Sequence, residues 1–256
     1  MQMTNNTILI TGGGSGIGRA LAEAFHALGN QVIIAGRRKQ VLEETTAQNP
    51  GMKSEILDIG SADAIRSFAA QIAKDYPDLN SVIHSAGVMR PEDLQSGGVA
   101  DAEATLITNL FGPIRLTAAL IPLLLGRPQA SIMTVSSGLA FVPMAMTPTY
   151  CATKAAIHSY TQSLRYQLRN TSIQVLELIP PYVQTELMGA AQTTDPRAMP
   201  LREFIAEIMN ILKNSPDVSE ICVERVKPLR FAESGGSYDA FFKSFNDSMA
   251  SAAASD

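Results

Sequence analysis

Ser137, Tyr150 and Lys154 are residues whose types and spacing could do chemistry together. Tyr150 and Lys154 are four positions apart in an alanine-rich segment that favours a helix, so their side chains would share one helix face. Ser137 comes thirteen residues before the tyrosine, at the end of a strand-like run. A free phenol titrates near ~10, and a cation beside it would lower that pKa. This set suits proton transfer to or from an alcohol oxygen.

The composition excludes several classes of protein. The 256 residues are 46% hydrophobic and 17% charged, which supplies one substantial core. A net charge of −4 gives no electrostatic footprint for nucleic acid or an acidic membrane surface. The N-terminus has no signal-peptide pattern, and Pro122 interrupts the longest apolar run before it reaches ~18 residues. We therefore expect a soluble, cytoplasmic protein without a membrane segment.

The possible metal ligands are scattered along the chain. The two cysteines, Cys151 and Cys222, have no metal-like spacing, and His26, His84 and His158 form no zinc pattern. We predict reduced cysteines and no bound metal. His84 is interpreted as a buried histidine rather than a catalytic one.

A glycine-rich loop follows the first strand-like run, at residues 7–10. It begins at Thr11 and leads into a helical stripe that stops at Gly29. Glycines let a backbone approach a phosphate, and a helix N-terminus stabilises the phosphate's charge. The spacing Gly-x-x-x-Gly-x-Gly differs from that of most dinucleotide folds, and alone it fits a tight turn equally well. The predicted cofactor contacts in this loop are Gly12, Gly14, Ser15, Gly16, Ile17 and Gly18.

The second and third strand-like runs, at residues 32–35 and 56–59, indicate which dinucleotide would bind. The second run is followed by Arg37 and Arg38, with no acid that could hold a ribose 2′-hydroxyl. Arginine suits a 2′-phosphate, so NADP(H) is the predicted cofactor. The alternative is that both arginines only begin the next helix in solvent. Asp58, beside Ile59, could accept from the adenine amino group or cap a turn.

Strand-like runs alternate with helical patterns through most of the chain. Further runs lie at residues 81–84, 130–135 and 172–179, and a long helix or two helices are expected over 101–125. Alternation predicts an α/β fold in three layers, with a doubly wound parallel sheet of six or seven strands in a single domain over residues 1–256. Ligands bind at the carboxyl ends of such strands, where the candidate residues fall.

The last seventy residues carry weaker signals. A substrate lid is expected over about residues 182–213, including a helix at 201–213. A helical tail is expected over about 216–250, because apolar residues recur at helical spacing from Val218 to Leu229. No seventh strand is visible there. The terminal helix at 239–249 could be an oligomer contact or a free end.

Several of these motifs together resemble the short-chain dehydrogenase/reductase family over about residues 5–190. They are Thr11-Gly12-x-x-x-Gly16-x-Gly18, Asn109, Ser137 and Tyr150-x-x-x-Lys154. The resemblance implies a Rossmann-type fold and NADP(H) preference. It implies that Tyr150 is the general acid or base, and that Lys154 lowers its pKa and holds the nicotinamide ribose. Ser137 would orient the substrate oxygen, and Asn109 would hold a water that links Lys154 to solvent.

The sequence departs from the family pattern in two places. Ser85-Ala86-Gly87 replaces the usual Asn-Ala-Gly, and Pro180-Pro181 replaces Pro-Gly, whereas Val183 and Thr185 match. The resemblance still implies cofactor contacts from these segments, with Thr185 bonding the carboxamide. The tail and the Gly-Arg-Arg turn resemble a bacterial subgroup associated with D-alanine esterification of teichoic acids, an association that says little about chemistry. A homodimer or homotetramer is implied at the family level.

The candidate substrate pocket is apolar. Its predicted residues are Leu139, Phe141, Met144, Tyr182 and Met188. Without an arginine or lysine among them, a neutral ketone, aldehyde or secondary alcohol is expected. The predicted activity is that of an NADP(H)-dependent carbonyl reductase, or an alcohol dehydrogenase in reverse. The alternatives are a non-catalytic NADP(H)-sensing protein and a nucleotide-sugar epimerase or dehydratase, although the tail is short for the latter's substrate domain.

Overall fold

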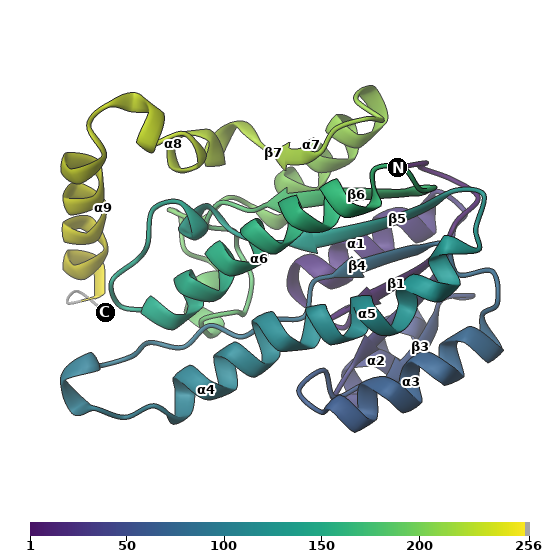
Figure 1. Ribbon diagram of the computed structural model, residues 1–256. Helices are drawn as coiled ribbons and strands as arrows, with labels where there is room; N and C mark the ends of the chain where they lie inside the picture. Colours follow the sequence, from purple (N-terminus) through teal and green to yellow (C-terminus); the bar gives the residue numbers. More distant parts are fainter. Residues whose placement is uncertain (254–256) are drawn as a thin grey trace.

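One parallel sheet of seven strands forms the centre of the molecule (Figure 1). The computed structural model describes residues 1–253, with side chains for residues 1–250. The strand order is β3-β2-β1-β4-β5-β6-β7. The strands are β1 (Thr7–Thr11), β2 (Gln31–Gly36), β3 (Lys53–Ile56), β4 (Ser81–His84), β5 (Ala130–Val135), β6 (Ile173–Ile179) and β7 (Glu220–Cys222). The predicted doubly wound α/β fold in a single domain is confirmed.

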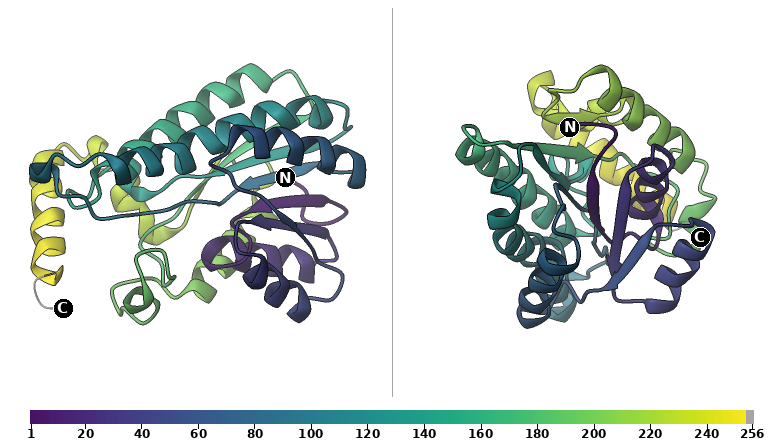
Figure 2. Two further views of the ribbon diagram at one scale, coloured as in Figure 1. Left: turned by 90° about the horizontal axis from the view of Figure 1, so that it is seen from below. Right: turned by 90° about the vertical axis from the view of Figure 1, so that its right-hand side faces the viewer.

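Helices cover both faces of the sheet (Figure 2, left). Helices α3, α5 and α6 pack on one face, and α1, α2 and α7 pack on the other. Helix α9 stands beside the carboxyl ends of the strands (Figure 1). The helices are α1 (Gly16–Ala27), α2 (Lys39–Gln48), α3 (Ala62–Asp75), α4 (Ala100–Leu106), α5 (Gly112–Leu125), α6 (Pro148–Leu168), α7 (Leu201–Asn214), α8 (Lys227–Arg230) and α9 (Tyr238–Ala253).

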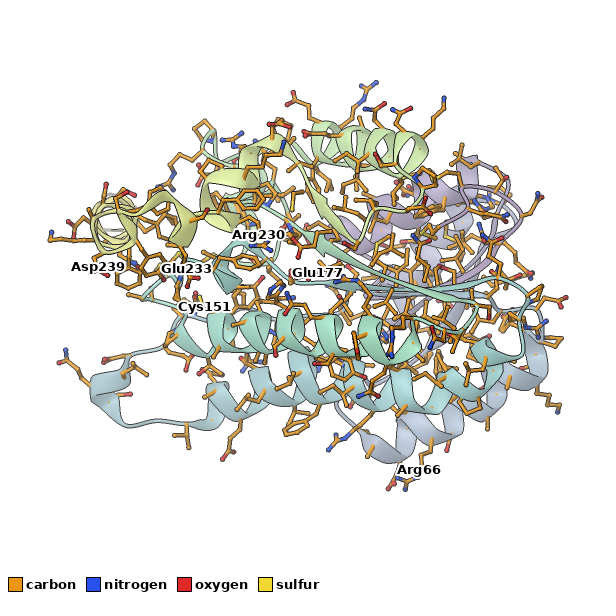
Figure 3. The ribbon with its side chains drawn as sticks, turned by 45° about the horizontal axis from the view of Figure 1, so that its top comes forward. Arg66, Cys151, Glu177, Arg230, Glu233 and Asp239 are labelled. Carbon is orange, nitrogen blue, oxygen red and sulfur yellow. The ribbon has the colours of Figure 1, made fainter. Side chains whose placement is uncertain are left out.

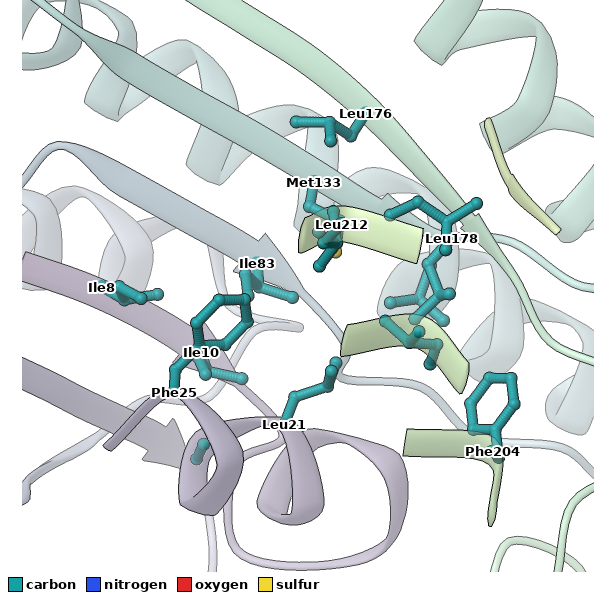
Figure 4. Packing of buried hydrophobic residues seen from close by; sticks show 14 of the residues in the cluster. Ile8, Ile10, Leu21, Phe25, Ile83, Met133, Leu176, Leu178, Phe204 and Leu212 are labelled. Atoms are coloured by element: carbon teal, nitrogen blue, oxygen red, sulfur yellow. The ribbon is translucent and has the colours of Figure 1, made fainter. Parts of the chain in front are cut away.

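The alternation of side chains along each strand divides the core in two. On β1, Ile8 and Ile10 pack toward Leu21 and Phe25 of α1, as Figure 4 shows. Leu9, between them, belongs to the cluster on the opposite face. Parallel strands are buried on both faces, so they read as continuous apolar runs. Burial of each isoleucine, leucine or phenylalanine side chain contributes about 1.5–3 kcal/mol to the free energy of folding.

The long apolar run Ala100–Leu125 is one helical stretch with a π-helical segment, η2 (Ile107–Phe111), in its middle. By length and composition alone its 26 residues could cross a membrane, a test that a core helix of a globular fold also passes. Polar residues within the run interrupt its apolar stretches without ending the helix. In this fold Leu116, Leu120 and Leu124 are buried against the sheet.

The prediction for residues 216–250 is partly wrong. A seventh strand, β7, pairs with β6 at the edge of the sheet, where a continuous helix is predicted. Three residues are too few to show a strand period, and the apolar spacing around Ile221 matches a helix by coincidence. Helix α7 confirms the helix predicted at 201–213, and α9 confirms the terminal helix.

Candidate active site

Ser137, Tyr150 and Lys154 come together where β5 meets α6. Pro148 occupies the first turn of α6, a position that suits proline, so Tyr150 and Lys154 follow on one buried face. The Ser137 hydroxyl lies close enough to the Tyr150 phenol to lower its pKa. The Lys154 Nζ donates to the Val135 carbonyl at 2.7 Å and lies 5.5 Å from the centre of the Tyr150 ring. The three predicted side chains therefore form one cluster.

Burial controls the protonation of this cluster. It raises the pKa of Tyr150 above its ordinary value, and the Ser137 hydroxyl acts against that shift. Burial also lowers the pKa of Lys154 to about 8, opposed by the Glu177 carboxylate. The predicted lowering of the Tyr150 pKa by Lys154 is therefore wrong for this arrangement. Desolvation of the buried phenol outweighs the effect of a cation that is bonded to the Val135 carbonyl.

Asn109 lies behind Lys154, within the π-helical segment η2. Its Oδ1 accepts from the Val88 amide at 2.8 Å, and its Nδ2 donates to the Val88 carbonyl at 2.8 Å. Asn109, Lys154 and His84 share a cavity of about 10 Å³, roughly the size of one water molecule. A π-segment shifts the register of a helix and often marks a functional residue.

His84 confirms its interpretation as a buried histidine. Its ring is enclosed, and Nε2 lies 2.8 Å from the Thr117 hydroxyl. Burial lowers the pKa of His84 to about 4, so the ring is neutral at physiological pH.

A cleft of about 610 Å³ runs from the glycine-rich loop to Tyr150. It is lined by every predicted cofactor contact except Asp58. That carboxylate instead accepts from the Gly60 amide at 3.0 Å, which is the turn-capping alternative. The predicted contacts that line the cleft are Gly12, Gly14, Ser15, Gly16, Ile17, Gly18, Arg37, Arg38, Ile59, Ser85, Ala86, Gly87, Tyr150, Lys154, Pro180, Val183 and Thr185.

The glycine-rich loop needs glycine because backbones meet there. Gly12 has φ +70°, and a Cβ at this residue would lie 2.8 Å from the Ala86 Cα. A Cβ at Gly18 would lie 2.4 Å from the Gly12 carbonyl oxygen. The Thr11 hydroxyl accepts from the Ser85 and Ala86 amides at 3.2 Å each, which ties the ends of β1 and β4 together. Backbone amides can therefore approach a phosphate without side chains between them.

Arg37 and Arg38 are exposed at the far end of the cleft from Tyr150. The Arg38 guanidinium donates to the Ser15 hydroxyl at 3.0 Å, so it already borders the glycine-rich loop. Arg37 makes no hydrogen bond or ion pair within the part of the chain that the structure describes. An anionic group in the cleft could therefore recruit both guanidinium groups.

All the residues predicted for the substrate pocket line the cleft except Phe141. Leu139, Met144, Tyr182 and Met188 line the cleft near Tyr150. The Phe141 ring instead packs edge-on against His158, with a centroid distance of 4.7 Å, and is covered by the Arg230 guanidinium. The 3₁₀ helix η3 (Gly138–Ala140) turns the chain after Ser137, which directs Phe141 away from the cleft. The prediction that it lines the pocket is wrong.

Four apolar residues of the substrate end were not predicted: Met89, Leu229, Phe245 and Met249. Phe245 and Met249 belong to α9 and are four residues apart, a spacing that puts them on one helix face. That spacing was a visible signal, but it does not say which surface the helix covers. Met188 of the predicted lid belongs to the same apolar cluster, and within the lid Gln192 donates to the Val183 carbonyl at 2.7 Å. The mobility of the lid stays a prediction.

A second cluster of ionisable groups lies beside the site. His158, Glu177 and Glu220 have ligand atoms within 4.8 Å of one another, as a metal site would require. Arg230, however, pairs with both Glu220 oxygens, at 2.8 and 3.1 Å. Figure 3 shows Arg230 and Glu177 together near the edge of the sheet. Since a cation already neutralises Glu220, the cluster is built as an ion-pair network rather than a metal site.

Comparison with known proteins agrees with this geometry. The short chain dehydrogenase family matches residues 6–196. A Bacillus subtilis protein, the uncharacterised oxidoreductase DltE, is 38% identical over 252 residues, which cover 96% of this chain and 98% of DltE.

Solved structures share the fold at lower identity. A short chain dehydrogenase from Burkholderia cenocepacia in complex with NADP has a TM-score of 0.80 at 22% identity, covering 94% of this chain and 99% of that one. A Burkholderia phymatum member in complex with NAD has a TM-score of 0.76 at 21% identity, covering 91% and 93%. The predicted family is confirmed over three quarters of the sequence, and this chain belongs to the short chain dehydrogenase family of oxidoreductases.

Proposed function

We propose that this chain transfers a hydride between NADP(H) and a neutral ketone or aldehyde, or the corresponding secondary alcohol. One observation carries the proposal: a single cleft joins the Ser137–Tyr150–Lys154 cluster to the glycine-rich loop and its two arginines. A proton donor at one end and an anion-binding loop at the other match the two parts of such a reaction.

The cleft fits a phosphorylated dinucleotide. The glycine-rich loop would hold the pyrophosphate, and Arg37 and Arg38 would hold a 2′-phosphate. Relatives with this fold bind NADP in one case and NAD in another, so the arginines carry the choice of NADP(H). When bound, the nicotinamide supplies a hydride to the carbonyl carbon or accepts one from the alcohol. Lys154 would hold its ribose, with Thr185 near the carboxamide.

The side chains around Tyr150 supply the proton path. Because burial raises the Tyr150 pKa, the phenol carries its proton at neutral pH and can give it to a carbonyl oxygen as negative charge develops there. Ser137 would donate to the same oxygen. Asn109 and the water-sized cavity behind Lys154 support replacement of the proton from solvent.

The surroundings of Tyr150 favour a substrate without charge. Two cations line this part of the cleft besides charged Glu186: Lys154 is held by the Val135 carbonyl, and Arg90 pairs with Asp101. A carboxylate would meet mainly methionine and leucine side chains there. Burying an unpaired charge costs on the order of several kcal/mol. The pocket should therefore bind neutral carbonyl compounds better than carboxylates.

The test is NADPH oxidation by the purified chain with neutral ketones and aldehydes, in parallel with keto acids of similar size. We expect turnover of the neutral compounds. Tyr150→Phe should lower kcat by about 10²–10⁴-fold, because the general acid is lost. Its NADPH Kd should stay unchanged.

Three outcomes would contradict the proposal. Undiminished turnover in Tyr150→Phe would exclude this phenol as the acid. Better turnover of keto acids would exclude the neutral substrate class. Tight NADPH binding without turnover of any carbonyl compound would favour the NADP(H)-sensing alternative.

Assembly and location stay predictions. We also propose a homodimer or homotetramer, as the family resemblance implies, and a cytoplasmic location, as the two cysteines without metal-like spacing favour. Light scattering of the purified chain would test the assembly, and a monomer at micromolar concentration would contradict it.

A further inference from the structure

Helix α9 reaches the substrate end of the cleft although it stands apart from the sheet (Figure 1). Phe245 and Met249 line the cleft and belong to the apolar cluster that includes Tyr150. No strand or cofactor-binding loop needs these two side chains. Their position therefore concerns the substrate rather than the cofactor or the core.

Specific hydrogen bonds hold α9 in this place. The Asn246 side chain accepts from the Ala145 amide at 2.6 Å and donates to the Pro143 carbonyl at 3.1 Å. The Tyr238 hydroxyl donates to the Phe141 carbonyl at 3.2 Å. These contacts attach the helix to the loop between Ser137 and α6. The loop that follows Ser137 is thus also the surface on which α9 packs.

Apolar side chains from several segments cluster between α9 and the site. The cluster around Tyr150 comprises Met144 and Cys151 with Met89, Leu139, Met146, Met188, Phe245 and Met249. Unbranched methionines adapt to ligands of different shape. A chamber of this kind binds carbon chains or rings through the area they bury.

We propose that Phe245 and Met249 complete an apolar chamber that receives the larger substituent of the carbonyl substrate, an alkyl chain or ring of several carbons. The inference rests on the proposed function, because the chamber selects a substrate only if Tyr150 protonates a carbonyl oxygen. The helix acts as a specificity element. Chemistry stays with Ser137, Tyr150 and Lys154.

The test is the chain-length dependence of kcat/KM over the methyl ketones from 2-butanone to 2-decanone, with NADPH. In the native chain kcat/KM should rise roughly 3–4-fold per methylene until the chamber is filled. Phe245→Ala and Met249→Ala should flatten this rise for the longer ketones while leaving the NADPH Kd nearly unchanged.

Phe242→Ala is the matched control. Phe242 lies on the same helix and stacks on Tyr238, with a centroid distance of 6.2 Å, but does not line the cleft. It should leave the chain-length dependence intact. A flat dependence in the native chain, or equal slopes in Phe245→Ala and Phe242→Ala, would overturn the inference. Since 2-butanone turnover is measured in the same series, its absence would instead indicate failure of the proposed function.

A buried carboxylate, Glu177, carries a second and independent inference. This residue of β6 is fully enclosed. Its Oε1 accepts from the Ser136 hydroxyl at 2.5 Å, and the His158 Nδ1 lies 2.9 Å from Oε2. A buried charge is costly unless it is paired. The proposed chemistry does not use Glu177, so a buried carboxylate beside the site must have another role.

That role is to stabilise the charged form of Lys154. Lys154 and His158 are four residues apart on α6 and face the same side of the helix, toward β6. Through space, the carboxylate of Glu177 favours the charged form of Lys154. The ammonium is enclosed and donates to an uncharged carbonyl oxygen, so a nearby anion offsets part of its desolvation.

The other ionisable groups around this pair cannot replace Glu177. Glu220 of β7 is already paired with Arg230 of α8. His84 of β4 is neutral, and the neighbouring groups Arg165 of α6 and Cys222 of β7 add no second anion.

We infer that Glu177 is a positioning residue: it fixes the Ser136–Ser137 turn and keeps the Lys154 ammonium charged. This inference also rests on the proposed function. The test is the pH profile of kcat/KM for a ketone that the native chain reduces, so that the function is established first. Activity should fall as pH rises through about 8, where Lys154 loses its proton.

Glu177→Gln keeps the shape and an acceptor for Ser136 but removes the charge. Its alkaline limb should move to lower pH by about one unit. Glu220→Gln, a carboxylate change in the same network, should leave the limb in place, and Glu177→Asp should restore it. If Glu177→Gln does not fold, Glu177→Asp provides the test instead, because it keeps the negative charge. Its pH profile should then have the same alkaline limb as that of the native chain. A uniform loss of activity at every pH, or an equal shift in Glu220→Gln, would overturn the inference.

Discussion

The two ends of the cleft are built in different ways. The cofactor end is made of backbone and small residues at the carboxyl ends of β1, β2 and β4, with Gly12 and Gly18 in close contact with other backbone atoms. The substrate end is made of large flexible side chains from separate segments, including Met89, Met188 and Phe245. One end has almost no tolerance for added atoms, whereas the other can adapt.

This difference shows where the fold permits variation. Backbone contacts at the ends of the strands cannot change without moving the sheet, because protein interiors are closely packed. Methionine and phenylalanine side chains on a terminal helix can change without disturbing the sheet at all. The same scaffold can therefore keep its cofactor end and exchange its substrate end.

The largest effect is expected from an added methyl group at the cofactor end. In Gly18→Ala the new Cβ would meet the Gly12 carbonyl oxygen at 2.4 Å, and neither backbone can yield. We expect a loss of about 1–3 kcal/mol in stability, together with weaker NADPH binding. Thermal melting and NADPH titration measure both.

Gly126→Ala is the control for that change, since its Cβ would meet the Leu123 carbonyl at an ordinary 3.5 Å. It should melt like the native chain. If Gly18→Ala also binds NADPH normally and melts like the native chain, the cofactor end is more tolerant than the packing indicates.

An intermediate effect is expected from the arginines. Arg37→Ala should raise the NADPH Kd by about 10–100-fold, which corresponds to the loss of one charged hydrogen bond, and should leave the NADH Kd unchanged. Arg38→Ala should also weaken NADH slightly, because Arg38 borders the loop through Ser15. Fluorescence titration with both cofactors measures the ratio. Equal losses for NADPH and NADH in Arg37→Ala would argue against a 2′-phosphate site.

The smallest effect on catalysis is expected at Phe141. Phe141→Ala removes the ring between His158 and Arg230, so it should cost about 1–3 kcal/mol of stability, less than a fully buried phenylalanine. The KM for ketones should change by less than about twofold, because the ring does not line the cleft. Chemical denaturation and steady-state kinetics separate the two quantities. A large rise in KM at unchanged stability would return Phe141 to the substrate pocket.

Sequence reasoning succeeded where function depends on short-range spacing. The pair Tyr150 and Lys154, and the glycine-rich loop, are local patterns whose geometry follows from helix and turn periodicity. Prediction from the sequence failed where contacts depend on how a turn joins two elements. The 3₁₀ turn after Ser137 redirects Phe141, and β7 is too short to show a strand period. The pKa of Tyr150 was predicted with the wrong sign because burial cannot be read from neighbours in the chain.

The sequence by itself determined the parallel α/β sheet, the residues at its strand ends and the set of Ser137, Tyr150 and Lys154 beside them. These features follow from periodicity and from the rule that parallel strands bring their carboxyl ends to one edge. Only the tertiary structure decided that Glu177 lies beside His158, one turn of α6 from Lys154, and that α9 lines one end of the cleft. The Asn246 side chain meets Ala145 across 101 residues of sequence. No local pattern specifies such a contact, because it depends on how every intervening element packs.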